Sequence, residues 1–345
     1  MNSFLPDYHD PIFSIIMIIM IAMAIAIVTH GWSIHRKEKM EKSLADFLNK
    51  FDGGGCSLEE NNVSFEEGMA GPLLMLANAF TKSGNYGKAI SICLYLIRHT
   101  HDDKLLIFLG KVYQSAGFLQ RAEKIFLEII KRHPRETDIL YRLEFLYETL
   151  QDYPKAREAI SALKAQNMDT SLHESHLDLL EIVSDKGSTS VEKAAGLSSM
   201  LEENPHFYRA IMQELFRLDT DLAWKHMDNR KIDLLLDILW LLMPTQLRLD
   251  IIAEDEVLSA IYYARGDLKR EVKPKECGIF TIDMLSAAKF GGYEEGDLQF
   301  SYICSSCKES FPVSFLRCPN CMKINTIKVE DSLVQEGPQR GYTIF

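Results

Sequence analysis

The apolar positions near the start of the chain form one long uninterrupted block. From Pro11 to Val28 the sequence PIFSIIMIIMIAMAIAIV contains no charged residue and is apolar on every side of a helix. With Thr29 to Ile34 it exceeds the roughly 20 residues that an α-helix needs to cross a bilayer. We therefore predict a single transmembrane helix within residues 1–35.

The alternatives to this span are a buried soluble helix and a cleaved signal peptide. A soluble helix would carry a polar stripe, and a signal peptide would begin with basic residues, whereas Asp7 and Asp10 precede this block. The basic residues all follow it, at Arg36, Lys37, Lys39 and Lys42. This asymmetry predicts that the C-terminal bulk of the chain faces the cytoplasm.

The next apolar residues follow a helical period and then stop. Leu44, Phe47, Leu48 and Phe51 fall on one face, which predicts an amphipathic helix that lies on the bilayer, binds a partner or packs on its own domain. Gly53-Gly54-Gly55 end this helix, and a polar, acidic linker extends to about residue 68. We assign residues 36–68 to this juxtamembrane helix and linker.

Beyond the linker, the apolar pattern repeats every 33 to 34 residues. Three segments align at Ala77, Gly110 and Glu144, at Phe80, Tyr113 and Tyr147, and at Ala89, Ala122 and Ala156. This is the period of tetratricopeptide repeats, which are pairs of helices. The second copy is similar to that repeat at Leu109-Gly110, Tyr113, Gly117, Ala122, Phe126 and Pro134.

The special residues of these copies have mechanical roles. Gly110 and Ala122 are expected to let two helices approach closely, and Gly84 and Gly117 to end the first helix of a pair. The third copy departs from the pattern, because it has Glu144 for the small residue and Gln151 for the turn glycine. The first copy has Cys93 at an aromatic position, which we interpret as a small buried hydrophobe.

Helical segments are expected to continue to the end of an α-solenoid at about residue 265. A fourth copy is predicted in residues 172–205 and the start of a fifth in FYRAIMQELFRL with DLAWKHM. The apolar run LDILWLLM is too short to cross a bilayer and is assigned to the core. A solenoid of this kind holds a peptide or a protein partner, and its His and carboxylate residues form no nucleophile and base pattern. We expect no enzymatic activity.

Composition and charge limit the classes of partner. The chain has 345 residues, 47% of them hydrophobic, and a net charge of −11, so it can form a sizeable core but is not built to coat nucleic acid. Seven cysteines are too few for a disulfide scaffold, and four of them gather near the C-terminus. Those four require a local explanation.

The segment YICSSCKESFPVSFLRCPNC contains two Cys-x-x-Cys turns, Cys304 with Cys307 and Cys318 with Cys321. Two such turns facing each other offer four sulfurs to one metal ion at about 2.3 Å each and leave no open position for a substrate. The predicted metal is structural, and it supplies roughly 10–16 kcal/mol of apparent folding free energy to a small module. Zinc is favoured, and iron in a rubredoxin-like site uses the same geometry.

The two cysteine pairs have three alternative interpretations. Thioredoxin-like chemistry would need a helix start and a βαβ pattern, whereas strand-like SYI, FPVSF and INTIKV flank these turns. A redox module with iron would be coloured. A nucleic-acid zinc ribbon could use Lys308, Arg317, Lys323 and Lys328, but acidic residues offset part of that charge. Cys56, Cys93 and Cys277 have no paired spacing and are expected to be bystanders.

The predicted organisation has six parts: an anchor (1–35), a juxtamembrane helix and linker (36–68), a tetratricopeptide solenoid (69–265), a connector (266–298), a four-cysteine module (299–330) and a tail (331–345). The fold class is mainly α, with a small rubredoxin-like or zinc-ribbon β module at the C-terminus.

This combination of anchor, repeats and cysteine module resembles the lipopolysaccharide assembly protein B family of Gram-negative bacteria. The resemblance is carried by Pro11 to Val28, by Leu109-Gly110 to Pro134, and by Tyr302 to Cys321 continuing as INTIK. It implies an inner-membrane adaptor that brings a membrane AAA metalloprotease to the lipid A deacetylase, with Cys304, Cys307, Cys318 and Cys321 as metal ligands. A generic assembly chaperone is the alternative among binding proteins. Lys308 and Met322 depart from the pattern, because such modules often have glycine after each turn.

Overall fold

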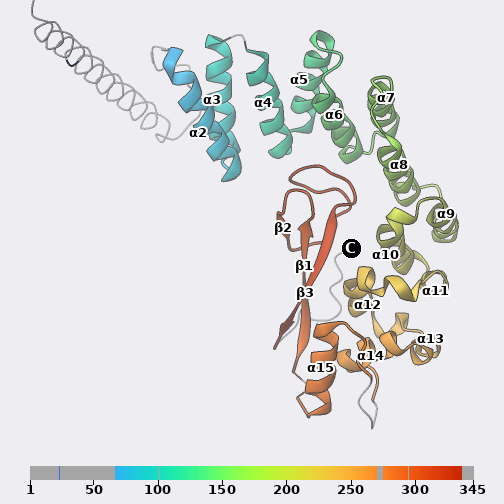
Figure 1. The fold of residues 1–345 in the computed structure, drawn as a ribbon. Helices are drawn as coiled ribbons and strands as arrows, with labels where there is room; N and C mark the ends of the chain where they lie inside the picture. Colours follow the sequence, from blue (N-terminus) through green and yellow to red (C-terminus); the bar gives the residue numbers. More distant parts are fainter. Residues whose placement is uncertain (1–22, 24–66, 101, 270–274, 294, 336–345) are drawn as a thin grey trace, which may run out of the picture. The chain divides into compact units, whose positions relative to one another are not determined.

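The computed structural model describes residue 23 and residues 67–100, 102–269, 275–293 and 295–335. These residues are mainly helical, with a small antiparallel sheet near the C-terminus (Figure 1). The chain divides into two compact units, one ending at Leu146 and the other beginning at Tyr147. Apart from Met23, the predicted anchor and the juxtamembrane helix lie outside the described residues. Among the described residues, no helix has both the length and the apolar content needed to cross a bilayer.

The first unit consists of consecutive helices that pack against their neighbours. They are η2 (Glu67–Met69), α2 (Ala70–Lys82), α3 (Tyr86–His99), α4 (Asp103–Ser115), α5 (Leu119–Arg132) and most of α6 (Thr137–Thr149). The pairs α2 with α3 and α4 with α5 make the most extensive contacts in this unit. The 33 to 34 residue period of the sequence is therefore a series of helical hairpins, as predicted.

Close helix packing explains the small residue in the second copy. A Cβ atom built on Gly110 would lie 2.5 Å from Cε1 of Phe126 and 3.2 Å from Cγ2 of Ile125. No real Cβ atom approaches a ring carbon so closely, so α4 and α5 can pack this way only because residue 110 has no side chain. Phe126 and Ala122 are both fully buried in the same contact region.

The turn positions of the hairpins have a left-handed backbone. Gly84 and Gly117 have φ values of 77° and 78°, which glycine adopts without a steric penalty. Gln151 has φ 57° at the corresponding turn of the next hairpin, where its amide donates to the Glu148 carbonyl at 3.0 Å. The third copy therefore makes the same turn as the first two, although it lacks the glycine.

The second unit contains the remaining helices and the sheet. The helices are α7 (Tyr153–Lys164), α8 (Ser171–Ser184), α9 (Ser190–Glu203), η3 (Pro205–Phe207), α10 (Tyr208–Leu218), α11 (Thr220–Lys225), η4 (Asn229–Leu235), α12 (Leu236–Leu241), η5 (Pro244–Gln246), α13 (Leu249–Glu254), α14 (Glu256–Arg265) and α15 (Phe280–Phe290). The hairpin α8–α9 corresponds to the predicted fourth copy. The helices α11, α12 and α13 are short, with six residues each, and Lys231 interrupts the helical backbone within η4.

The sheet has three antiparallel strands in the order β2-β1-β3: β1 (Asp297–Cys304), β2 (Ser310–Phe311) and β3 (Ile327–Val334). Tyr302 of β1 pairs with Phe311 of β2 on one side and with Val329 of β3 on the other. Strand β3 packs against α15, as Figure 1 also indicates. The sheet therefore packs on α15, and its strand β1 ends at Cys304, the first cysteine of the cluster.

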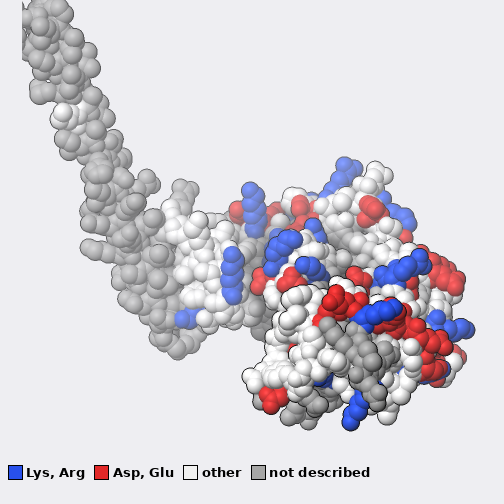
Figure 2. Space-filling view, turned by 60° about the horizontal axis from the view of Figure 1, so that its bottom comes forward, with Lys and Arg blue, Asp and Glu red and all other residues white. Residues whose placement is uncertain are grey.

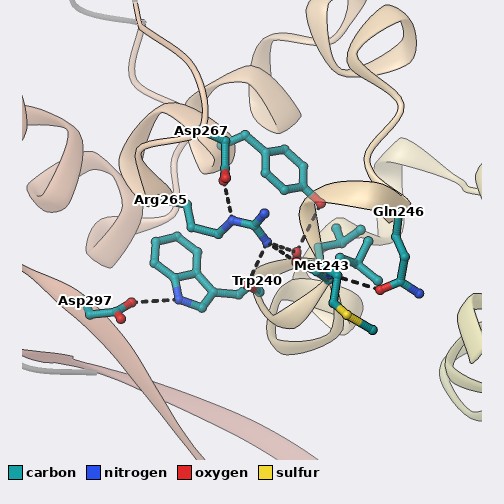
Figure 3. Close-up of polar contacts among 9 residues, drawn as sticks. Trp240, Met243, Gln246, Arg265, Asp267 and Asp297 are labelled. Carbon is teal, nitrogen blue, oxygen red and sulfur yellow. Dashed lines mark hydrogen bonds and ion pairs between the residues drawn. The ribbon is translucent and has the colours of Figure 1, made fainter. Parts of the chain in front are cut away.

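The apolar run LDILWLLM belongs to the core as predicted, except for its last residue, Met243, which is exposed. Ile238, Leu239 and Trp240 are buried in one cluster with Tyr262 and with Leu298 of β1. The carbonyls at the end of α12 are paired by a buried arginine, because Arg265 Nη1 donates to the carbonyls of Leu239, Trp240 and Leu242 at 3.2, 2.8 and 2.9 Å (Figure 3).

Two further hydrogen bonds in Figure 3 stabilise the same region. The Tyr262 hydroxyl donates to the Leu239 carbonyl at 3.0 Å, and the Trp240 indole N–H donates to Asp297 Oδ1 at 2.9 Å. The Trp240 bond joins α12 directly to the first residue of β1. The sheet is therefore attached to the helices by a polar contact as well as by a shared apolar core.

Candidate metal centre

The four predicted cysteines meet at one end of the sheet. Their sulfur atoms all lie within 4.8 Å of one another. The Sγ atoms of Cys304 and Cys321 are 3.6 Å apart, and those of Cys307 and Cys318 are 3.7 Å apart. Cys304 and Cys318 are buried and the other two are half-buried. Among the described residues, this is the one group of Cys, His, Asp and Glu side chains assembled closely enough to hold a metal ion.

The two Cys-x-x-Cys segments have the same backbone structure. We call Cys304–Lys308 the first turn and Cys318–Met322 the second turn. In each, the amide of the second cysteine donates to the sulfur of the first at 3.5 Å. In each, the amide of the residue after the second cysteine donates to the carbonyl of the first cysteine at 2.9 Å. The two turns therefore present their cysteine sulfurs in the same way, and they face each other.

Lys308 and Met322, which stand where glycine was expected, have the backbone conformation typical of glycine. Their φ values are 63° and 60°, so both adopt the left-handed conformation that glycine adopts most readily. The sequence lacks glycine at these positions, but the backbone still takes the conformation that favours it. The two turns thus share one backbone conformation at the residue after the second cysteine.

The spacing of the sulfurs fits a tetrahedral metal ion. A regular tetrahedron with metal–sulfur bonds of about 2.3 Å has sulfur–sulfur distances of about 3.8 Å. Two of the six sulfur–sulfur distances, 3.6 and 3.7 Å, are close to that value, and all six are within 4.8 Å. A set of four thiolate sulfurs suits zinc or iron and does not suit magnesium or calcium, which prefer oxygen ligands. The four cysteines could hold such an ion.

The surroundings of the sulfurs favour thiolate at one position in particular. Burial tends to raise the pKa of Cys304, but hydrogen bonds from the Thr326 hydroxyl and from the amides of Cys307 and Ser306 lower that pKa to about 6. The Thr326 Oγ1 atom lies 3.2 Å from Cys304 Sγ. Burial raises the pKa of Cys318 to about 12. This effect of Thr326 on the Cys304 thiol could not be predicted from the spacing of the cysteines.

Arg317 does not belong to a basic surface. The sequence grouped it with Lys308, Lys323 and Lys328 as a possible phosphate-binding set, but its side chain is only 5% exposed and lies 2.8 Å from Glu148 Oε2. The three lysines are exposed. On the face drawn in Figure 2, basic and acidic side chains are interspersed over the described residues, without a continuous basic patch.

The other described cysteines do not belong to this cluster. Cys93 is fully buried, and burial raises the pKa of its thiol to about 12. Cys277 is half-buried, and burial raises its pKa to about 11. Both thiols are therefore protonated and unreactive near neutral pH. Cys56 lies outside the described residues.

The cysteine turns are attached to the helices at several points. Asn325 Nδ2 donates to the His206 carbonyl at 2.7 Å, and Thr281 of α15 bonds to Asp331 of β3. Ile324 and Leu298 belong to the same apolar core as the helices. Burial, together with the neighbouring Asp237 carboxylate, raises the pKa of Tyr302 above its ordinary value. The second turn and the sheet are thus part of the helical unit.

Comparisons with known proteins give no assignment. No protein-family model matches the chain, and a search of curated proteins finds no significant match. The chemistry of the centre therefore rests on its own residues.

Proposed function

We propose that this chain is a non-enzymatic adaptor whose helical hairpins bind protein partners and whose four cysteines hold a structural metal ion. The observation that carries the proposal is the closed set of four sulfurs, all within 4.8 Å of one another. It is joined to the helical core through Leu298 of β1 and through Ile324, which follows the second turn. Four protein ligands fill a tetrahedral ion, so neither a substrate nor a reactive water has a coordination position. The ion would stabilise the fold and would perform no chemistry.

In this proposal the hairpins are tetratricopeptide-type repeats and the cysteine module is rubredoxin-like. The close approach at Gly110 and the left-handed turns at Gly84, Gly117 and Gln151 support the first assignment. The pair of equivalent turns supports the second. Repeats of this kind present a concave surface that binds extended or helical segments of other proteins.

The resemblance to the lipopolysaccharide assembly protein B family suggests which partners these are. We infer a protein of the inner membrane, held by residues 1–35 with its bulk in the cytoplasm, that brings a membrane AAA metalloprotease to the lipid A deacetylase. Such an adaptor would limit lipopolysaccharide synthesis. Nucleic acid is not among the proposed partners, because the net charge is −11 and Arg317 is buried.

Depletion of the protein in its own cells tests the adaptor role. The deacetylase level should rise when the chain is depleted and return when it is supplied again. Affinity capture from membranes should recover the protease together with the chain. An unchanged deacetylase level, with the supplied chain still in the membrane fraction, would contradict this function and favour a generic assembly chaperone.

The proposed ion is zinc. Elemental analysis of the purified, reduced protein should find about one equivalent of zinc, and the protein should be colourless. A red protein with one equivalent of iron and a reversible reduction potential would instead favour a membrane-tethered electron-transfer module. Absence of both metals would remove the structural role on which the adaptor proposal depends.

A further inference from the structure

Arg317 connects the second cysteine turn to a distant helix. It directly precedes the ligand Cys318, and its Nη1 atom donates to the carbonyl of Met322 at 3.2 Å. Its Nη2 atom lies 2.8 Å from Oε2 of Glu148, which is near the end of α6. One guanidinium therefore joins the last residue of the second turn to a carboxylate of the helical hairpins.

Glu148 extends this connection to α8. Its Oε1 atom lies 2.9 Å from Nε2 of His176, whose side chain is 1% exposed. The Glu148 and Arg317 side chains are 12% and 5% exposed, so all three polar groups are shielded from water. His176 Nδ1 makes no hydrogen bond with any of the described residues. The pairing of His176 thus depends on the position of Glu148, which in turn pairs with Arg317.

A second contact leads from the other flank of the second turn to η3, which touches α8. Asn325 Nδ2 donates to the His206 carbonyl at 2.7 Å. The next residue, Phe207, is fully buried and stacks on the His176 ring, with a centroid distance of 6.2 Å and an interplanar angle of 22°. Residues on both sides of the second turn are therefore linked to His176, Arg317 through Glu148 and Asn325 through η3.

The energetics make this connection sensitive to the state of the turn. A buried ion pair is stable only while its geometry is good, and loss of one partner is strongly destabilising because a buried charge is left uncompensated. The positions of Arg317 and of the Met322 carbonyl depend on the backbone of the second turn. When a metal ion is bound, it fixes that turn through Cys318 and Cys321.

We propose that Arg317 is a positioning residue that couples occupancy of the four-cysteine metal centre to the packing of α8. Removal of the ion releases the second turn, Arg317 no longer neutralises Glu148, and α8 loses its polar contact through His176. Metal loss thereby loosens the hairpins that present the partner-binding surface. This inference rests on the structural metal of the proposed function and is independent of the identity of the clients.

Hydrogen exchange measured by mass spectrometry on the full-length chain tests the coupling. Peptides from α8 (Ser171–Ser184) are followed in the zinc-loaded chain, after removal of zinc with a chelator, and after zinc is added back. Elemental analysis of each sample gives the metal content. The variant Arg317→Met is compared with Lys323→Met, which removes an exposed positive charge from the same module.

In the unsubstituted chain, zinc removal should speed exchange in α8 by roughly tenfold or more, and zinc should reverse it. Arg317→Met should give a similar increase with zinc still bound, whereas Lys323→Met should give none. In the double variant Arg317→Met with Glu148→Gln, zinc removal should no longer change exchange in α8. The glutamine side chain introduced at position 148 can still accept a hydrogen bond from His176, but it carries no charge.

Two results would overturn the proposal. One is exchange in α8 that is unchanged by zinc removal in the unsubstituted chain. The other is a double variant in which zinc removal still speeds exchange as much as before, since Arg317 and Glu148 would then serve only a structural role. If the Arg317→Met variant lost its zinc, exchange in α8 would be compared in the Glu148→Gln variant instead, because residue 148 lies outside the cysteine turns. A chain with no metal at all would count against the proposed function, and elemental analysis detects that outcome separately.

Discussion

Lys308 and Met322 occupy the same position in the two cysteine turns, and both have a left-handed backbone, with φ values of 63° and 60°. In each turn this residue donates its amide to the carbonyl of the first cysteine at 2.9 Å. A residue with a Cβ atom has a steric cost of roughly 1–2 kcal/mol in this conformation. The two turns therefore contain strain that the fold has to offset elsewhere.

Replacing either residue by glycine should stabilise the cysteine module. We expect Lys308→Gly and Met322→Gly each to raise the free energy of unfolding by about 0.5–1 kcal/mol, because the steric gain exceeds the greater flexibility of glycine in the unfolded chain. The effect is measured by chemical denaturation of the zinc-loaded protein. Lys323→Gly is the control and should be neutral or destabilising, since its φ is not left-handed. Equal destabilisation in all three variants would contradict the assigned backbone strain.

Metal content distinguishes the four clustered cysteines from the others. Cys304→Ser or Cys318→Ser should abolish stoichiometric metal binding and unfold the module, because each removes one of four ligands that converge within 4.8 Å. Elemental analysis and near-UV circular dichroism measure the two effects.

Cys93→Ser is the matched control for these variants. Cys93 is fully buried in the first unit and is not part of the cluster, so this change should leave the metal content unaltered and cost about 1–3 kcal/mol for burying a hydroxyl. Equal metal content in all three variants would show that the cluster does not hold the ion.

The sequence revealed those features of the fold that depend on local spacing. The period of the repeats, the turn glycines Gly84 and Gly117, and the two Cys-x-x-Cys pairs are each encoded within a few dozen residues. The small residue predicted at position 110 is required by a single close contact, the one with Phe126. These features could be predicted because each is a property of one hairpin or one turn.

The contacts around the metal centre could not be predicted in this way. Arg317 and Glu148 lie far apart in the chain, and nothing in either local segment distinguishes a buried pair from two surface charges. Their pairing depends on how the sheet packs on the helices. The same applies to Thr326, whose hydroxyl lowers the pKa of Cys304, since that contact requires β3 to fold back beside β1.

The close approach of α4 and α5 gives a test of the hairpin packing. We expect Gly110→Ala to destabilise the first unit by about 1–2 kcal/mol, because the added methyl would lie 2.5 Å from a Phe126 ring carbon and overpacking exceeds the gain in helix propensity. Gly87→Ala in α3 is the control. Apart from its chain neighbours and the nearby backbone of α3, no atom lies within 4 Å of its new methyl group, so it should stabilise by about 0.5–1 kcal/mol. Thermal denaturation of both variants provides the comparison, and a stabilising Gly110→Ala would exclude the contact.

The buried thiol of Cys93 should make the stability of the first unit depend on alkaline pH. Burial raises its pKa from the ordinary value of 9.0 to about 12, so the folded chain retains this proton where the unfolded chain loses it. The resulting stabilisation is fully present below pH 9 and is lost as the pH rises towards 12. In the variant Cys93→Ala the unfolding free energy, measured by urea denaturation at a series of pH values from 8 upwards, should therefore fall less steeply than in the unsubstituted chain. Ser91→Ala on the same helix removes no ionisable group and should leave the slope unchanged. Parallel curves for all three proteins would mean that the Cys93 thiol ionises equally well in the folded and the unfolded chain.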